Sequence, residues 1–286
     1  MKTKRLYSEA SEKLSLTNDG ELELFFIGVG SAFANNNFQT NVLIVKGETH
    51  IMVDFGQKGQ TALWETAHLK PTDIENILLT HSHADHIGGI ETLGLTNRYV
   101  GRPMLNKKLL NMIISPEYQR ILWDYSLRGG MEWNEQADTG VKLSFSDFFK
   151  SISPTWKTHQ PREIFEIEFG GIHLEMFRTT HIPDASPSWE QSFISYGLMI
   201  DDQVFYSGDT KFDPELVDMY ADKAEIIFHD VQFFPGGVHA PLADLRTLDP
   251  DIKKKMYLMH YADNWADQDI SDFGGWTEQG VRYIFE

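Results

Sequence analysis

His81-Ser82-His83-Ala84-Asp85-His86 is the stretch that decides how the 286-residue sequence is interpreted. It follows segment 75–80, whose apolar run predicts a buried strand. Neutral imidazole and carboxylate are ligands that suit zinc, manganese or iron. In a loop leaving the strand, His81 and His83 can turn toward one point, and Asp85 and His86 toward a second point nearby. The stretch therefore predicts a metal site.

Three later residues are candidate ligands because each follows a segment with a strand-like pattern. Reactive groups in sheet-based enzymes lie beyond the strand ends, where the loop backbone can aim them. A single metal ion would not need ligands from elsewhere, so these residues point to a site for two. They are His181 after 173–177, Asp209 after 203–206 and His260 after 255–259.

Charge limits the partners that the protein can bind. The sequence has 25 Lys and Arg against 42 Asp and Glu, a formal net charge of −17. Such a surface repels a polyanion, so long nucleic acid is a disfavoured partner. A small anionic ligand can still bind, because metal ions and local basic groups dominate inside a cleft.

The absence of cysteine means that any metal site uses nitrogen and oxygen ligands. The basic start at 1–5 is not followed by the apolar stretch of a secretory signal. No apolar run approaches the roughly 18 residues that cross a bilayer. We therefore expect a soluble cytoplasmic protein without a membrane partner.

The order of elements favours two packed sheets with helices outside, an α/β arrangement in a single domain over 1–286. The stretch 97–160, rich in Tyr, Trp, Met and charge, is interpreted as an insertion or lid within it. Strands are predicted at 22–27, 40–45, 50–55, 75–80, 162–169, 173–177, 193–200, 203–206, 225–228 and 255–259. Helical segments are predicted at 61–69, 71–73, 106–114, 117–127 and 214–220.

The segment around His81 resembles the His-x-His-x-Asp-His signature of the metallo-β-lactamase superfamily, and the later His, Asp and His follow in that family's order. The resemblance implies a four-layer αββα sandwich with two metal ions at one edge. Zinc is the default metal, and manganese is an alternative. The resemblance implies His81, His83 and His181 at one metal, Asp85, His86 and His260 at the other, and Asp209 between them.

Two further features refine this family assignment. Asp54, in Val53-Asp54-Phe55-Gly56, is similar to the family's early Asp-x-Gly and is expected to steady the histidine loop, or otherwise to cap its strand. Many lactamases have a cysteine at the position of Asp209, and this chain has none. Antibiotic hydrolysis is therefore not expected.

The pair His229-Asp230 resembles the His-Glu element of the RNase Z-like phosphodiesterase branch, with Asp in place of Glu. The resemblance implies that His229 protonates the leaving oxygen, and a neighbouring carboxylate favours the imidazolium that this role requires. Asp85 or Asp209 would orient a metal-activated hydroxide that attacks phosphorus. A structural role for His229 stays open. The turn Gly28-Val29-Gly30 is interpreted as part of the site rim.

Phe38 and Asn41 lie in a segment similar to compact relatives that open 3′,5′-cyclic nucleoside monophosphates, the anti-Pycsar proteins and their bacterial homologues. This resemblance and the acidic charge favour a cyclic nucleotide phosphodiesterase. His239, on a loop rich in Gly and Pro, is a candidate contact to phosphate, in its own chain or across a homodimer, which is the expected assembly. Aromatic side chains that can stack a base are Trp123, Tyr125, Trp133, Trp189, Phe233 and Phe234.

Three other functions stay open from the sequence. RNase Z-like endonucleases and glyoxalase II-like thioesterases share the same seven ligands, and a protein that binds nucleotide without cleaving it would keep them too. Activity on precursor tRNA, activity on S-lactoylglutathione, or retention of nucleotide without product would distinguish these alternatives.

Overall fold

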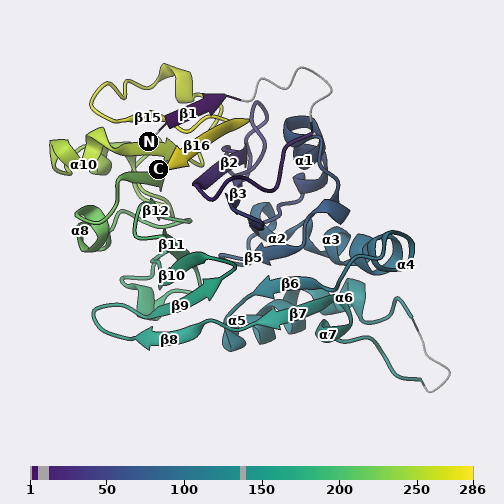
Figure 1. Ribbon diagram of the computed structural model, residues 1–286. Helices are drawn as coiled ribbons and strands as arrows, with labels where there is room; N and C mark the ends of the chain where they lie inside the picture. Colours follow the sequence, from purple (N-terminus) through teal and green to yellow (C-terminus); the bar gives the residue numbers. More distant parts are fainter. Residues whose placement is uncertain (1, 6–12, 136–139, 286) are drawn as a thin grey trace.

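The computed structural model describes residues 2–5, 13–135 and 140–285. Its strands form two eight-stranded sheets, and helices cover both outer sides, so the predicted αββα sandwich is confirmed (Figure 1). In Figure 1, α1, α3 and α4 lie on one side of the strands, and α8 and α10 on the other.

The first sheet carries the strand that leads to the histidine cluster. Neighbouring strands are antiparallel from β1 to β4 and parallel from β4 to β7. In spatial order the strands are β1 (Lys2–Arg5), β16 (Val281–Phe285), β2 (Leu22–Gly28), β3 (Asn41–Lys46), β4 (Thr49–Val53), β5 (Asn76–Leu78), β6 (Leu110–Ile113) and β7 (Phe149–Ile152).

The second sheet carries the other candidate ligands. Its strands are parallel from β15 to β12 and antiparallel from β12 to β8. In spatial order they are β15 (Gly275–Trp276), β14 (Met256–Met259), β13 (Ile226–Asp230), β12 (Val204–Tyr206), β11 (Tyr196–Ile200), β10 (Ile172–Arg178), β9 (Ile164–Phe169) and β8 (Thr155–Thr158).

The helices are short. Within the described ranges, none is long and apolar enough to cross a membrane. The α-helices are α1 (Gly59–Ala67), α2 (Ala84–Ile87), α3 (Ile90–Thr96), α4 (Arg102–Leu105), α5 (Pro116–Leu122), α6 (Arg128–Met131), α7 (Phe145–Phe148), α8 (Pro214–Ala221), α9 (Leu242–Leu245) and α10 (Pro250–Lys254). The 3-10 and π turns are η1 (Pro71–Asp73), η2 (Asn97–Gly101), η3 (Trp123–Leu127), η4 (Trp189–Gln191) and η5 (Trp265–Asp267).

One helix prediction is wrong. Segment 106–114 contains β6, which pairs in parallel with β5 and β7. A short apolar run buried on both faces has no alternation that distinguishes a strand from a helix. The stretch 97–160, interpreted as an insertion or lid, therefore supplies β6 and β7 to one sheet and β8 to the other.

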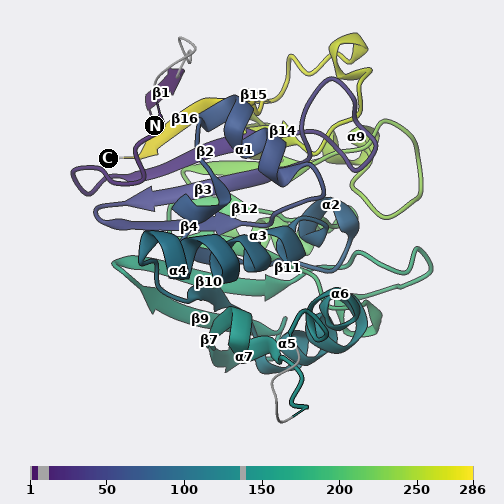
Figure 2. The same ribbon diagram turned by 90° about the vertical axis from the view of Figure 1, so that its right-hand side faces the viewer.

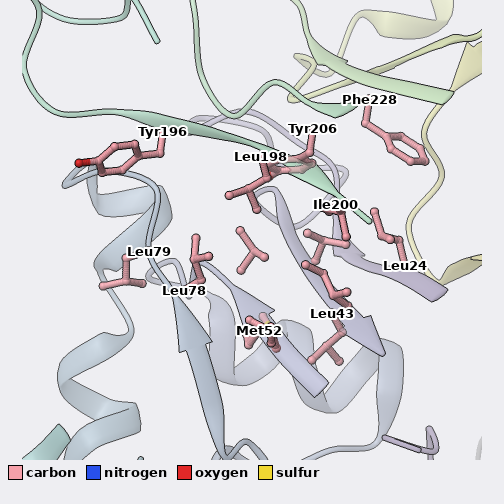
Figure 3. Packing of buried hydrophobic residues seen from close by; sticks show 14 of the residues in the cluster. Leu24, Leu43, Met52, Leu78, Leu79, Tyr196, Leu198, Ile200, Tyr206 and Phe228 are labelled. Carbon is pink, nitrogen blue, oxygen red and sulfur yellow. The ribbon is translucent and has the colours of Figure 1, made fainter. Parts of the chain in front are cut away.

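The core lies between the two sheets. Figure 3 shows Leu198 and Ile200 of β11 facing Leu43 of β3, and Phe228 of β13 near Leu24 of β2. These side chains are fully buried. Because both sheets present apolar residues to this layer, the sandwich is held mainly by the hydrophobic effect.

Phe228 is the side chain in this layer whose loss we expect to be most costly. The centroid of its ring lies 4.8 Å from that of Phe26 and 5.0 Å from that of Tyr283, and both of these residues belong to the opposite sheet. Phe228→Ala is expected to lower the free energy of unfolding by about 3–5 kcal/mol, as large-to-small changes in cores do. Urea unfolding measures this loss. Trp156→Ala, on exposed β8, is the control, and an equal loss there would contradict the assignment.

Candidate metal centre

The candidate ligands lie at one edge of the sandwich, beyond the ends of strands from both sheets. His81 and the start of α2 follow β5, whereas His181, Asp209 and His260 follow β10, β12 and β14. Gly208, before Asp209, has φ +58°, and a Cβ there would lie 2.3 Å from the Tyr196 carbonyl oxygen. This close approach requires glycine and fixes where the Asp209 carboxylate enters the site.

The first group of donor atoms comes from three histidines and Asp209. His83 Nδ1 lies 3.1 Å from His81 Nε2 and 3.1 Å from His181 Nε2. Asp209 Oδ2 lies 3.7 Å and 3.8 Å from the same two Nε2 atoms. One potential ligand atom from each of these four residues lies within 4.8 Å of every other, a spacing that suits one cation.

A second group shares Asp209 with the first. Its oxygen Oδ2 lies 3.2 Å from His86 Nε2 and 3.5 Å from His260 Nε2. Asp85 Oδ2 lies 3.3 Å and 3.2 Å from those two nitrogens. The structure thus brings together all seven residues predicted as metal ligands, in two groups that share one carboxylate.

The donor set fits divalent cations. Asp209 Oδ2 and His86 Nε2 are buried, and within the described residues neither has a hydrogen-bond partner. Buried polar atoms are normally satisfied, so these two atoms require a ligand. His83 Nδ1 also lies 3.1 Å from two other imidazole nitrogens, an arrangement that suits a shared cation.

Burial keeps two imidazoles of the first donor group neutral, whereas in the second group Asp209, Asp85 and Asp54 outweigh burial and raise the pKa of His86. Burial lowers the pKa of His81 well below its usual value and that of His181 to about 4, although Asp209 acts in the opposite direction. Burial alone would raise the pKa of Asp209, but His260 and His86 hold it well below its usual range. Neutral imidazole and ionised carboxylate are the forms that bind metal.

Asp54 holds the histidine loop, as expected. Its Oδ2 accepts a hydrogen bond from Thr80 Oγ1 at 2.7 Å and lies 2.7 Å from His86 Nδ1. Its Oδ1 accepts from the Thr80 backbone N–H at 2.8 Å. A carboxylate at Nδ1 directs Nε2 toward the second donor group. The backbone of Asp54 has φ 62°, which Asp tolerates better than most residues.

Asp54→Asn should therefore weaken metal binding. We expect metal affinity to fall about 10- to 100-fold, because one carboxylate oxygen becomes an NH2 group, and either the Thr80 backbone N–H or His86 Nδ1 then loses its oxygen partner. Competition against a chelator measures the change. Asp202→Asn, at an exposed turn, is the matched control. Equal affinity of the Asp54 variant and the wild type would show that Asp54 does not orient His86.

The geometry disfavours the role predicted for His229. This side chain is fully buried, and its ring stacks on Phe205 with 6.4 Å between the ring centroids. Its Nδ1 lies 2.8 Å from the carbonyl oxygen of Asp230, and among the described residues His229 belongs to none of the donor groups.

His239 of the same chain lies at the cluster instead. Its Nδ1 is 2.9 Å from Asp230 Oδ2 and 3.9 Å from Asp209 Oδ2. Burial alone would lower the pKa of His239, but the hydrogen bond with Asp230 and the charge of Asp209 raise it overall. Of the pair His229-Asp230, only the Asp230 carboxylate therefore lies at the cluster. The histidine beside that carboxylate is His239, which was predicted as a phosphate contact.

Two predicted substrate contacts, Asn41 and Phe38, instead stabilise the fold. Asn41 is buried, accepts from the Gly56 N–H at 3.0 Å and donates to the Gln39 carbonyl oxygen at 2.6 Å. It is therefore not available to a ligand, a correction to its predicted role. Phe38 packs against the core. Gly30 bridges to Gln39 and Tyr261, which places the predicted rim turn beside His260.

Three of the six predicted stacking aromatics pack against other side chains. Trp123 packs on Phe145 and Phe148, Trp189 is buried against Arg178, and Phe233 packs on Trp276. Tyr125, Trp133 and Phe234 are exposed, and Lys142 Nζ lies 3.6 Å from the centroid of the Trp133 ring. Phe234 belongs to the loop that carries His239.

The sandwich and this donor set define the class of the protein, a chain with the metallo-β-lactamase fold and a candidate site for divalent cations. The metallo-β-lactamase fold protein YhfI from Bacillus subtilis matches 93% of this chain and 100% of its own with a TM-score of 0.65 and 16% identity. A diphosphatase from the PhnP family matches 93% and 98% with a TM-score of 0.65 and 14% identity. The chain belongs to the anti-Pycsar protein Apyc1 family, whose profile matches residues 22–283. Anti-Pycsar protein Apyc1 of Bacillus phage BSP38 is 33% identical over 252 residues, which cover 86% of this chain and 91% of the phage protein.

Proposed function

We propose that this chain is a phosphodiesterase that hydrolyses 3′,5′-cyclic nucleoside monophosphates to 5′-monophosphates with two divalent cations, zinc by preference. The observation that carries the proposal is the pair of donor groups sharing Asp209, with the His239–Asp230 pair at their edge. Membership of the anti-Pycsar family supports the choice of substrate.

The residues divide into two metal sites. His81, His83 and His181 would hold one cation, Asp85, His86 and His260 the other, and Asp209 would contact both. Bound cations would supply Lewis acidity and a water of lowered pKa. Asp85 and Asp209 are proposed to orient the attacking water, which is a second role for both carboxylates.

His239 would provide the proton for the leaving oxygen. In the reaction, the bond between phosphorus and O3′ breaks, a bond forms from phosphorus to the water oxygen, and O3′ needs a proton. Asp230 holds Nδ1 of His239, so Nε2 is the nitrogen that can donate it. The hydrogen bond with Asp230 raises the pKa of His239 and thereby favours the protonated form that can donate.

The surroundings suit a small anion. With a formal net charge of −17, the chain repels long nucleic acid, while a mononucleotide phosphate would bind where the cations outweigh that charge. A homodimer and a cytoplasmic location stay predictions.

A substrate panel tests the proposal. Metal-loaded protein should open purine and pyrimidine cyclic nucleotides to 5′-monophosphates and lose this activity to a chelator. It should leave precursor tRNA and S-lactoylglutathione intact. Cleavage of precursor tRNA with intact cyclic nucleotides would favour an RNase Z-like enzyme, and turnover of the thioester a glyoxalase II-like one. Nucleotide retained on a column without product would favour a binding protein.

A further inference from the structure

Loop 31–38, which follows β2, lies beside the second donor group. The backbone N–H of Ser31 donates to the Tyr261 carbonyl oxygen at 3.1 Å, directly after His260. Gln39 Nε2 donates to the Ala32 carbonyl oxygen at 3.2 Å. The loop is thereby tied to the segment that supplies one of the predicted ligands of the second cation.

Loop 31–38 is held firmly although much of it is exposed. The Asp263 carboxylate accepts from the backbone N–H groups of Asn35 at 3.0 Å and Asn36 at 2.9 Å. Gln279 Oε1 accepts from the Phe38 N–H at 2.8 Å. Phe33 is carried on this fixed loop with 93% of its surface exposed. Because the loop backbone is already fixed, this ring can contact a ligand without a further cost of ordering the loop.

A second exposed ring lies on another loop that is tied to the cluster. Loop 232–240 is closed by the bond from the Gln232 N–H to the Ala240 carbonyl oxygen at 2.9 Å. The Val238 carbonyl oxygen lies 2.8 Å from His181 Nδ1, which ties this loop to the first donor group. Phe234, on the same loop, is 62% exposed. Figure 2 shows the purple loop after β2 and the green loop before α9 at the same edge as α2.

We propose that Phe33 and Phe234 bind the base of the nucleotide while the cluster to which their loops are tied binds its phosphate. This inference rests on the proposed function. An aromatic ring stacks on a base without needing charge, which suits a chain whose surface repels anions. Two phenylalanine side chains bury at most about 500 Å². A stable protein interface needs about 1,200 Å² or more. Their isolated rings therefore fit a small ligand better than a second copy of the chain.

Phe33→Ala and Phe234→Ala test the proposal with two substrates. One is 3′,5′-cyclic AMP, and the other is methyl riboside 3′,5′-cyclic phosphate, which has the same sugar and phosphate without a base. We expect kcat/KM for cyclic AMP to fall about 5- to 150-fold in each variant, mainly through KM. The loss with the substrate that lacks a base should be much smaller. Phe33→Trp should retain activity on cyclic AMP.

Trp156→Ala is the matched control, because Trp156 is 56% exposed on β8, outside both loops. Unchanged kinetics in the Phe variants, or equal losses on both substrates, would overturn the proposal. The proposal would also be overturned if light scattering showed that a Phe variant had changed from dimer to monomer and this change accounted for its loss of kcat/KM. If the wild type cleaves neither substrate, the proposed function fails. Calorimetry then tests base binding on its own by measuring the affinities for AMP and for ribose 5-phosphate. Phe33→Ala should weaken the binding of AMP but not that of ribose 5-phosphate.

Discussion

Asp209→Ala is expected to abolish turnover and leave the fold intact. Asp209 is the one residue shared by both donor groups, and its Oδ2 lies within 3.8 Å of four imidazole nitrogens. Its removal weakens both predicted cation sites at once. A cation contributes several kcal/mol of transition-state stabilisation, so kcat should fall by about 10⁴-fold or more.

The measurement combines metal content per chain, turnover of cyclic nucleotide and circular dichroism. His83→Ala should also abolish turnover, with the main loss at the first donor group. Asp202→Asn, at an exposed turn, removes a carboxylate without touching the site and should behave as the wild type. Full activity in either the Asp209 or the His83 variant would contradict a catalytic centre of two cations.

The sequence was sufficient to select the seven ligand candidates, because each follows a strand and its position along the chain is visible without coordinates. Their convergence was not visible, since it depends on the packing of two sheets. β5 belongs to one sheet and β10, β12 and β14 to the other. Only the sandwich brings the loops that follow these strands to the same edge.

The sequence could not show that His229 points away from the cluster, for a reason that strand geometry explains. Successive side chains of a strand point to opposite faces of the sheet. Asp230 of β13 points to the cluster, so His229 points the other way, toward Phe205. β13 is buried on both faces, and its sequence therefore lacks the polar alternation that would have shown this.

Phe33 was not among the predicted stacking residues because nothing in the sequence separates an exposed phenylalanine from a core one. Its exposure follows from the bonds of Asp263 and Gln279 to loop 31–38, and both residues are more than 200 positions distant. Asn41 shows the opposite case. The resemblance of its segment to compact relatives suggested a substrate contact, but its side chain is hydrogen-bonded to the backbone of Gly56 and Gln39.

His239→Ala should lower kcat by about 10²- to 10⁴-fold, the usual effect of losing a general acid. His229→Asn should have little effect on kcat, because the amide keeps a donor for the Asp230 carbonyl oxygen and the side chain lies away from the cluster. The comparison shows which of the two histidines donates the proton to the leaving oxygen. A large loss in the His229 variant with normal activity in the His239 variant would restore the original assignment.

Asp230→Asn should change how kcat depends on pH, because Asp230 is hydrogen-bonded to His239. The hydrogen bond with Asp230 raises the pKa of His239, so its loss lowers that pKa. A general acid acts only while protonated, and kcat therefore decreases as the pH rises through its pKa. The decline of kcat on the alkaline side should consequently begin at lower pH in Asp230→Asn than in the wild type. His239→Ala should lack that decline altogether, because no acid remains to be titrated. An alkaline decline at the same pH in the wild type and in Asp230→Asn would show that His239 is not the proton donor.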